Sequence, residues 1–111
     1  MEAVVNGKTI QLSEAGWLEN LDEWSEELAV EIAKNEHIPE LTQEHWDIIH
    51  TAREFFLDEG VVAEPRKFSK IMKDKFGADR SSQQYIYSLF PTGLIKCANK
   101  VAGLPRPKGC S

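Results

Sequence analysis

The strongest constraint on the fold of this chain is a series of apolar stripes at helical spacing, each followed by a glycine or a proline. Within a stripe, apolar residues recur at intervals of three and four, which places them on one face of an α-helix. Proline cannot continue a helix, and glycine readily adopts the left-handed conformation that caps one. The pattern predicts helices over about residues 21–36, 42–59, 65–76, 81–90 and 92–102, ended by Pro39, Gly60, Gly77, Pro91 and Gly103.

Residues that favour helix starts stand near the beginning of four of these stretches. Asn20 and Thr42 are suitable N-caps for the first and second helices, because their side-chain oxygens accept an unpaired backbone N–H. Pro65 suits the first turn of the third helix. Ser81 and Gln84 form a capping-box pattern before the fourth. These signals strengthen the prediction of a mainly helical body.

Asn6 and Gly7 separate two short apolar runs near the N-terminus. Both residues tolerate the positive φ angles of a type I′ turn, so residues 3–12 are predicted to form a β-hairpin. Two strands alone are marginally stable, and the hairpin must therefore pack on the helices. The predicted fold class is mainly α (α+β), a helical bundle of about five helices with an N-terminal β-hairpin and a mobile C-terminal arm. One domain is expected over residues 1–103, with the arm over 104–111.

The composition is typical of one ordinary globular domain. The 111 residues are 41% hydrophobic and 28% charged, which argues against extensive disorder. The N-terminus lacks a basic segment followed by a long apolar run, and no stretch approaches the roughly 18 apolar residues that span a bilayer. We therefore expect a cytoplasmic protein with no membrane partner, in which both cysteines are reduced thiols.

The last eight residues are expected to form an exposed arm that serves in docking and carries the chemistry. Prolines remove amide donors and cations resist burial, so the segment suits neither a helix nor a buried strand. A thiol on such an arm has no packing role, and Cys110 is therefore the candidate catalytic residue. The segment consists of Leu104, Pro105, Arg106, Pro107, Lys108, Gly109, Cys110 and Ser111.

Cys97 has the spacing of a packed helical residue, three positions after Leu94 and four before Val101. Free cysteine is among the most often buried residue types, so packing is the favoured role and a secondary reactive thiol is the alternative. The arm can span about 20 Å at roughly 3 Å per residue. A disulfide between Cys97 and Cys110 is therefore sterically possible.

Charge is divided unevenly, with 15 acidic and 3 basic residues in 1–60 and 3 acidic and 10 basic residues in 61–111. A basic half can dock on acidic proteins or on nucleic acid. The third and fourth predicted helices could also mimic a helix-turn-helix of a nucleic-acid-binding adapter, although the acidic first half and the apolar fourth helix argue against it. The side chains that would contact phosphates are Arg66, Lys67, Lys70, Lys73 and Lys75.

Other kinds of site find little support in the sequence. His37, His45 and His50 lack the spacing of a helical metal chelate, and no CxxC pattern accompanies them. No P-loop, G-x-G-x-x-G or G-x-S-x-G motif is present. The tryptophans are better explained by packing than by base stacking; they are Trp17, Trp24 and Trp46.

The C-terminal run over residues 100–111, KVAGLPRPKGCS, closely resembles the signature of the DsrC/TusE family. Internal stretches agree with the same family: WSE at 24–26, EHW at 44–46 and YIYSLFP at 85–91. The resemblance covers nearly the whole chain. It implies a mostly helical domain with a β-hairpin and a C-terminal arm, whose penultimate cysteine, here Cys110, carries sulfur as a persulfide or trisulfide. It implies no metal or organic cofactor.

The resemblance leaves two branches open for the function. TusE-like members take sulfur from a TusBCD-like complex and pass it to a tRNA 2-thiouridylase, which implies these partners and an indirect tRNA contact. DsrC proper is a partner of dissimilatory sulfite reductase and carries a second cysteine immediately before the residue matching Lys100. Here that position is Asn99, and Cys97 is about 200° away around a helix, so it is a poor substitute. This departure favours a single-thiol sulfurtransferase of the TusE type.

Overall fold

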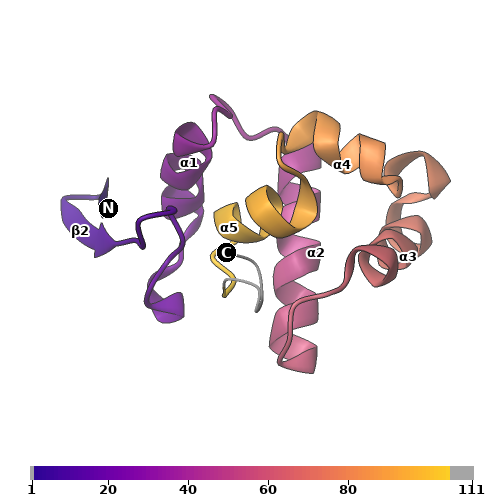
Figure 1. The fold of residues 1–111 in the computed structure, drawn as a ribbon, viewed down its shortest axis with the longest axis horizontal. Helices are drawn as coiled ribbons and strands as arrows, with labels where there is room; N and C mark the ends of the chain where they lie inside the picture. Colours follow the sequence, from indigo (N-terminus) through magenta and orange to yellow (C-terminus); the bar gives the residue numbers. More distant parts are fainter. Residues whose placement is uncertain (1, 106–111) are drawn as a thin grey trace.

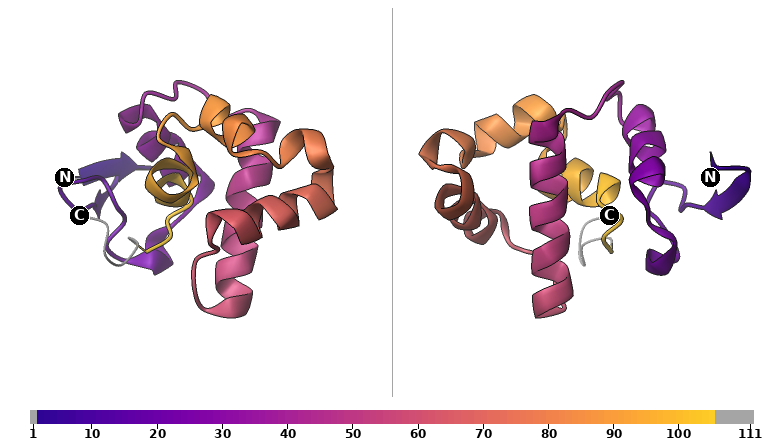
Figure 2. Two further views of the ribbon diagram at one scale, coloured as in Figure 1. Left: turned by 45° about the vertical axis from the view of Figure 1, so that its right-hand side comes forward. Right: turned by 180° about the vertical axis from the view of Figure 1, so that it is seen from behind.

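The C-terminal segment, by which we mean residues 94–104, lies at the centre of the molecule, between α1 (Glu26–Asn35) and α2 (Gln43–Glu59) (Figures 1 and 2). The computed structural model describes residues 2–105. The hairpin lies at one end of an elongated body, and α3 and α4 lie at the other (Figure 1). The elements are β1 Glu2–Val5, β2 Lys8–Gln11, the 3₁₀ turn η1 Leu21–Glu23, α1 Glu26–Asn35, α2 Gln43–Glu59, α3 Pro65–Phe76, the 3₁₀ turn η2 Ala78–Arg80, α4 Gln83–Leu89, the π-helical turn η3 Leu94–Ala98 and α5 Asn99–Val101.

The N-terminal hairpin forms as the Asn-Gly pair predicts. Asn6 and Gly7 have φ angles of 52° and 80°, the positive values that a type I′ turn requires. β1 and β2 pair antiparallel, with Ala3 opposite Ile10. Both of these side chains are buried, and β1 packs against α1. The hairpin is therefore stabilised by a helix, as its small size demands.

The prediction of a first helix over residues 21–36 is wrong for the first five of these residues. Asn20 caps only the 3₁₀ turn η1, where its Oδ1 accepts the N–H of Asp22 at 3.1 Å. Trp24 is extended, and α1 starts after Ser25, whose Oγ accepts the N–H of Leu28 at 3.1 Å. The reason is that the Trp24 side chain packs against the C-terminal segment, as described below, rather than joining the apolar stripe of α1.

The predictions for α2 and α3 are confirmed at both ends. Thr42 caps α2, Gly60 ends it with φ of 77°, and Pro65 begins α3. His45 completes a capping box at the start of α2, where its Nδ1 accepts the backbone N–H of Thr42 at 3.0 Å. Its Nε2–H then donates to the carbonyl oxygen of Leu89 at 3.0 Å, so this buried histidine joins α2 to α4.

The two C-terminal helices are shorter than predicted. Ser82, rather than Ser81, caps α4 and accepts the N–H of Tyr85 at 3.0 Å. The predicted helix over 92–102 begins at Leu94 with a π-helical turn and continues as α-helix to Val101. Gly93 precedes it with φ of 83°. Within residues 2–105, no helix combines the length and apolar content needed to cross a lipid bilayer.

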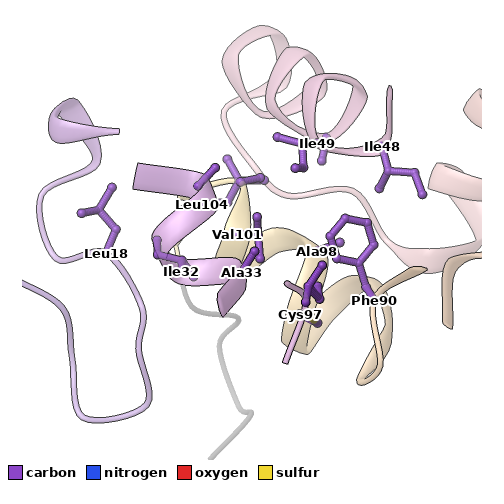
Figure 3. Packing of buried hydrophobic residues seen from close by; sticks show 14 of the residues in the cluster. Leu18, Ile32, Ala33, Ile48, Ile49, Phe90, Cys97, Ala98, Val101 and Leu104 are labelled. Atoms are coloured by element: carbon purple, nitrogen blue, oxygen red, sulfur yellow. The ribbon is translucent and has the colours of Figure 1, made fainter. Parts of the chain in front are cut away.

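The core forms where α1, α2 and the C-terminal segment meet (Figure 3). Full burial of one aliphatic side chain contributes about 1.5–3 kcal/mol, so this cluster is a main source of stability. The C-terminal segment contributes several side chains to this cluster, so removal of the segment would expose the core. Labelled members are Leu18, Ile32, Ala33, Ile48, Ile49, Phe90, Cys97, Ala98, Val101 and Leu104.

Candidate functional site

The structure describes the base of the C-terminal arm but not its tip. Of the predicted arm residues, Leu104 and Pro105 are described, and the others lie outside the described residues. We call residues 103–105 the arm root. Leu104 is only 2% exposed, so the prediction that the exposed arm starts at this residue is wrong. The residues outside are Arg106, Pro107, Lys108, Gly109 and the candidate catalytic residue Cys110.

Leu104 is buried because the arm root forms a Schellman cap on α5. Gly103 has φ of 70°, its N–H donates to the carbonyl of Lys100 at 3.1 Å, and the N–H of Leu104 donates to the carbonyl of Asn99 at 3.0 Å. In this motif an apolar residue just after the left-handed glycine packs back on the helix. The sequence signal for burial was therefore the Gly-Leu pair, which outweighs the prolines that follow.

Two further side chains bind the last carbonyls of the C-terminal segment. The Nε1–H of Trp24 donates to the oxygen of Val101 at 3.0 Å, and Nη1 of Arg53 donates to the oxygen of Ala102 at 2.8 Å. The Arg53 guanidinium carbon lies 3.9 Å from the centroid of the Trp24 ring, a close cation–π contact. Trp24, which directly follows η1, and Arg53 of α2 thus hold the arm root in place.

Position 103 requires glycine for two reasons, its positive φ angle and its close contact with Trp24. A Cβ atom at this position would lie 2.2 Å from Cδ1 and 2.8 Å from Cγ of Trp24, which is far inside van der Waals distance. The indole ring therefore lies directly on the backbone of the arm root. No other residue type can occupy position 103 without moving Trp24.

Sequence reasoning missed the role of Arg53. The signal was its position on α2, four residues after Ile49 and three before Phe56, on a predicted apolar stripe. A cation at such a position is uncommon unless it has a specific partner. Trp24 was predicted only as a packing residue, and its hydrogen bond to Val101 adds a second role.

A mostly buried ion pair also holds the C-terminal segment in place. The Nζ of Lys100 lies 3.2 Å from Oε2 of Glu36, with side-chain exposures of 11% and 17%. The ammonium also lies 5.5 Å from the centroid of the Trp17 ring. Removing one member of such a pair leaves an uncompensated charge, so these residues hold α5 against the end of α1.

Cys97 faces the core and is only 1% exposed (Figure 3). Burial raises the pKa of its thiol, while a hydrogen bond with the backbone of Thr92 acts in the opposite direction and the negative charge of Glu36 raises the pKa further. The thiolate is the reactive form of cysteine, and at this position it is disfavoured. The geometry suits a packing residue and opposes nucleophilic chemistry at Cys97.

The other candidates from the sequence are dispersed. Among residues 2–105, no group of histidine, cysteine and carboxylate side chains is arranged to hold a metal ion. His50 instead lies 3.2 Å from Glu26 and stacks on Trp46. The five basic side chains of α3 are exposed, but the hydroxyl of Tyr85 on α4 is bonded to Glu44 rather than presented at a groove.

Comparison with known proteins decides the family. The family model described as "DsrC like protein" matches residues 4–111. This chain belongs to the DsrC-like family. The recognition of the family and the predicted fold class are thereby confirmed, and the arm root lies inside the matched region.

Relatives of both branches are similar to this chain. The sulfurtransferase TusE of Salmonella typhimurium (strain LT2) is 43% identical over 107 residues, which are 96% of this chain and 97% of the relative. TusE of Escherichia coli (strain K12) is 41% identical over the same shares. The oxidized gamma-subunit of dissimilatory sulfite reductase, DsrC, from Archaeoglobus fulgidus is 42% identical with a TM-score of 0.89 over all of both chains. DsrC of Allochromatium vinosum is 38% identical with a TM-score of 0.85, again over all of both chains. Overall identity therefore does not separate the branches.

Replacing Gly103 with alanine should be much more damaging than replacing Gly60. Both glycines have positive φ, but a Cβ at Gly60 meets nothing within 4 Å, whereas at Gly103 it collides with Trp24. We expect Gly60→Ala to cost about 1 kcal/mol of unfolding free energy and Gly103→Ala about 3 kcal/mol. Urea unfolding of the two variants measures the difference. Equal costs would contradict the contact between Trp24 and the arm root.

Cys97 should resist alkylation in the folded protein. Its burial and raised pKa predict that iodoacetamide at pH 8 modifies Cys110 quickly and Cys97 only after unfolding. Peptide mass mapping before and after addition of urea distinguishes the two cysteines. Rapid modification of Cys97 in the native state would show that the C-terminal segment opens far more readily than its packing indicates.

Proposed function

We propose that this protein is a sulfur carrier that accepts sulfur as a persulfide on Cys110 and hands it to an acceptor protein. The favoured pathway is the relay that supplies sulfur for 2-thiouridine in tRNA. Support comes from the relatives named sulfurtransferase TusE, at 41–43% identity over nearly the full chain, and from the C-terminal signature that includes Cys110. The cytoplasm is the compartment in which this activity is expected.

The proposed chemistry is an exchange between thiols. The Cys110 thiolate attacks the outer sulfur of a donor persulfide, the S–S bond of the donor breaks, and the donor cysteine leaves as a thiolate. Cys110 then carries the outer sulfur as its own persulfide. One S–S bond breaks and one forms, so no external oxidant or reductant is required. The handover to the acceptor repeats this exchange in the opposite role.

The observation that carries the single-thiol mechanism is the burial of Cys97. A thiol that is 1% exposed cannot take part in exchange without opening the core. The position at which DsrC proper has its second cysteine is here Asn99. Cys110 is therefore the one thiol proposed to react, and sulfur leaves it by transfer to another protein rather than to a second cysteine of this chain.

The proposed partners follow from this pathway. A TusBCD-like complex would donate the sulfur, and a tRNA 2-thiouridylase would accept it. The side chains of α3 add positive charge to the surface, since Arg66, Lys70 and Lys73 are exposed. Such charge can orient the carrier on an acidic donor or near a tRNA bound to the acceptor.

A DsrC-like role with a dissimilatory sulfite reductase is the second candidate. It is favoured by the TM-score of 0.89 and 42% identity to the Archaeoglobus fulgidus protein. A two-thiol mechanism in this chain would need Cys97 as the partner of Cys110. The burial of Cys97 and the asparagine at position 99 both weigh against it.

Sulfur loading can be followed directly by intact-mass measurement. After exposure to a persulfide donor, wild type and Cys97→Ala should each gain about 32 Da, one sulfur atom, and Cys110→Ser should gain nothing. Cys97→Ala is the matched control, because it removes the other thiol with a small change in core volume. A mass gain that persists in Cys110→Ser would refute the assignment of the carrier residue.

Oxidation separates the two candidate functions. Treatment of the folded protein with diamide should give no peptide that joins Cys97 to Cys110, because the buried thiol is inaccessible. In urea the same treatment should give that peptide, which shows that the digest can detect it. A Cys97–Cys110 peptide obtained from the folded protein would favour the two-thiol mechanism of the DsrC-like role.

A further inference from the structure

A surface hollow of about 350 Å³ lies directly beside the arm root. Its lining includes the Trp24–Arg53 pair, Phe56, Leu57 and Leu104. Leu57 is 72% exposed, although it is a large aliphatic side chain on the regular helix α2. We call this feature the Arg53 hollow. It combines apolar walls, a cation and the point at which the chain departs toward Cys110.

The guanidinium of Arg53 is only partly satisfied by the described residues. An arginine has five N–H donors, and within residues 2–105 the structure records one hydrogen bond from this group, to Ala102. No carboxylate in that part of the chain lies within ion-pair distance of it. Burial lowers its pKa, the sign of a cation that has lost part of its hydration. A carboxylate would restore the lost interaction.

Arg80 provides an internal contrast. Its guanidinium also lies over an aromatic ring, that of Phe76 at 4.7 Å, but it donates to Asp47 at 2.7 Å and to Tyr85 at 3.0 Å. Arginine stacked on an aromatic ring is thus completed by a carboxylate elsewhere in this molecule. At Arg53 the ring and the cavity are present, but none of the described carboxylates lies within ion-pair distance of the guanidinium.

We propose that the Arg53 hollow is a docking site for a sulfur-relay partner, in which Arg53 binds a carboxylate side chain of the partner and Leu57 contacts an apolar side chain next to it. This inference rests on the proposed function for the class of partner. The position supports it, because Cys110 is six residues beyond Leu104 and is within about 20 Å of the hollow at roughly 3 Å per residue. A partner held here has the reactive thiol within reach.

A nearby carboxylate should weaken the binding of an anion in the hollow. Asp22 also lines it and is exposed, so its carboxylate repels an incoming anion. Salt screens such repulsion between exposed charges, so the effect should be larger at low ionic strength. Neutralising Asp22 should therefore strengthen carboxylate binding, whereas neutralising Arg53 should abolish it. A purely structural role of Arg53 predicts no effect of Asp22 on a ligand.

The test is an NMR titration of the full chain with two tripeptides, acetyl-Leu-Glu-Leu-amide and its glutamine analogue. The glutamate peptide should shift the indole N–H signal of Trp24 and the Nε–H signal of Arg53, with a dissociation constant on the order of 10 mM. The glutamine peptide is the matched control and should shift neither. Equal shifts with both peptides, or none with either, would overturn the proposal.

Variants sharpen the assignment. Arg53→Gln should lose the Trp24 shift, Asp22→Asn should tighten binding about twofold, and Arg80→Gln should bind the glutamate peptide as wild type does. Signals of Trp24 that change on dilution would identify a second copy as the occupant. Signals of Trp24 that change when the C-terminal carboxylate is converted to an amide would identify that carboxylate as the occupant. Either result overturns the assignment to a partner.

The docking site and the proposed function can fail separately. The gain of one sulfur on Cys110 from a small persulfide donor tests the carrier function and requires no docking. The peptide titration tests the Arg53 hollow and requires no sulfur chemistry. A chain that loads sulfur but ignores the glutamate peptide retains the function and loses the docking site, and the reverse result does the opposite.

Discussion

The contact between the Trp24 indole and the backbone of Gly103 is the interaction on which the position of the arm root depends. It requires a residue without a side chain at position 103, and it brings the indole N–H onto the carbonyl of Val101 at 3.0 Å. The guanidinium carbon of Arg53 lies 3.9 Å from the centroid of the Trp24 ring, and Arg53 donates a hydrogen bond to the next carbonyl, that of Ala102. These contacts hold the arm root against α2 and Trp24.

The same contacts also stabilise the short helix of the C-terminal segment. A short α-helix of three residues preceded by a π-helical turn has little stability of its own. It persists because Cys97, Val101 and Leu104 are buried between α1 and α2, and because its terminal carbonyls are bound by side chains from other elements. Tertiary contacts therefore stabilise this short helix where its own length does not.

The sequence predicts most of this fold, because the hairpin and helices depend on local patterns. Asn6 and Gly7 specify their turn, and Thr42, Gly60 and Pro65 mark the ends of α2 and α3 correctly. The errors arise where a distant contact overrides the local pattern. Trp24 matches the stripe of α1 but packs on Gly103, and Leu104 precedes prolines but completes the cap. Periodicity cannot reveal partners 79 residues apart, such as Trp24 and Gly103, and the same limit concealed the role of Arg53.

Asn99 occupies the position at which the proposed one-thiol mechanism and the alternative two-thiol mechanism would differ. The fold uses this residue through its backbone, since its carbonyl oxygen accepts the N–H of Leu104 in the Schellman cap. That bond makes no demand on the side chain, so asparagine here and the cysteine expected in DsrC proper are both compatible with the same arm root. Overall similarity to TusE and DsrC proteins is likewise nearly equal, at 43% and 42% identity. The side chain at position 99 is itself only 2% exposed, so a residue there must also fit the packed interior around α5.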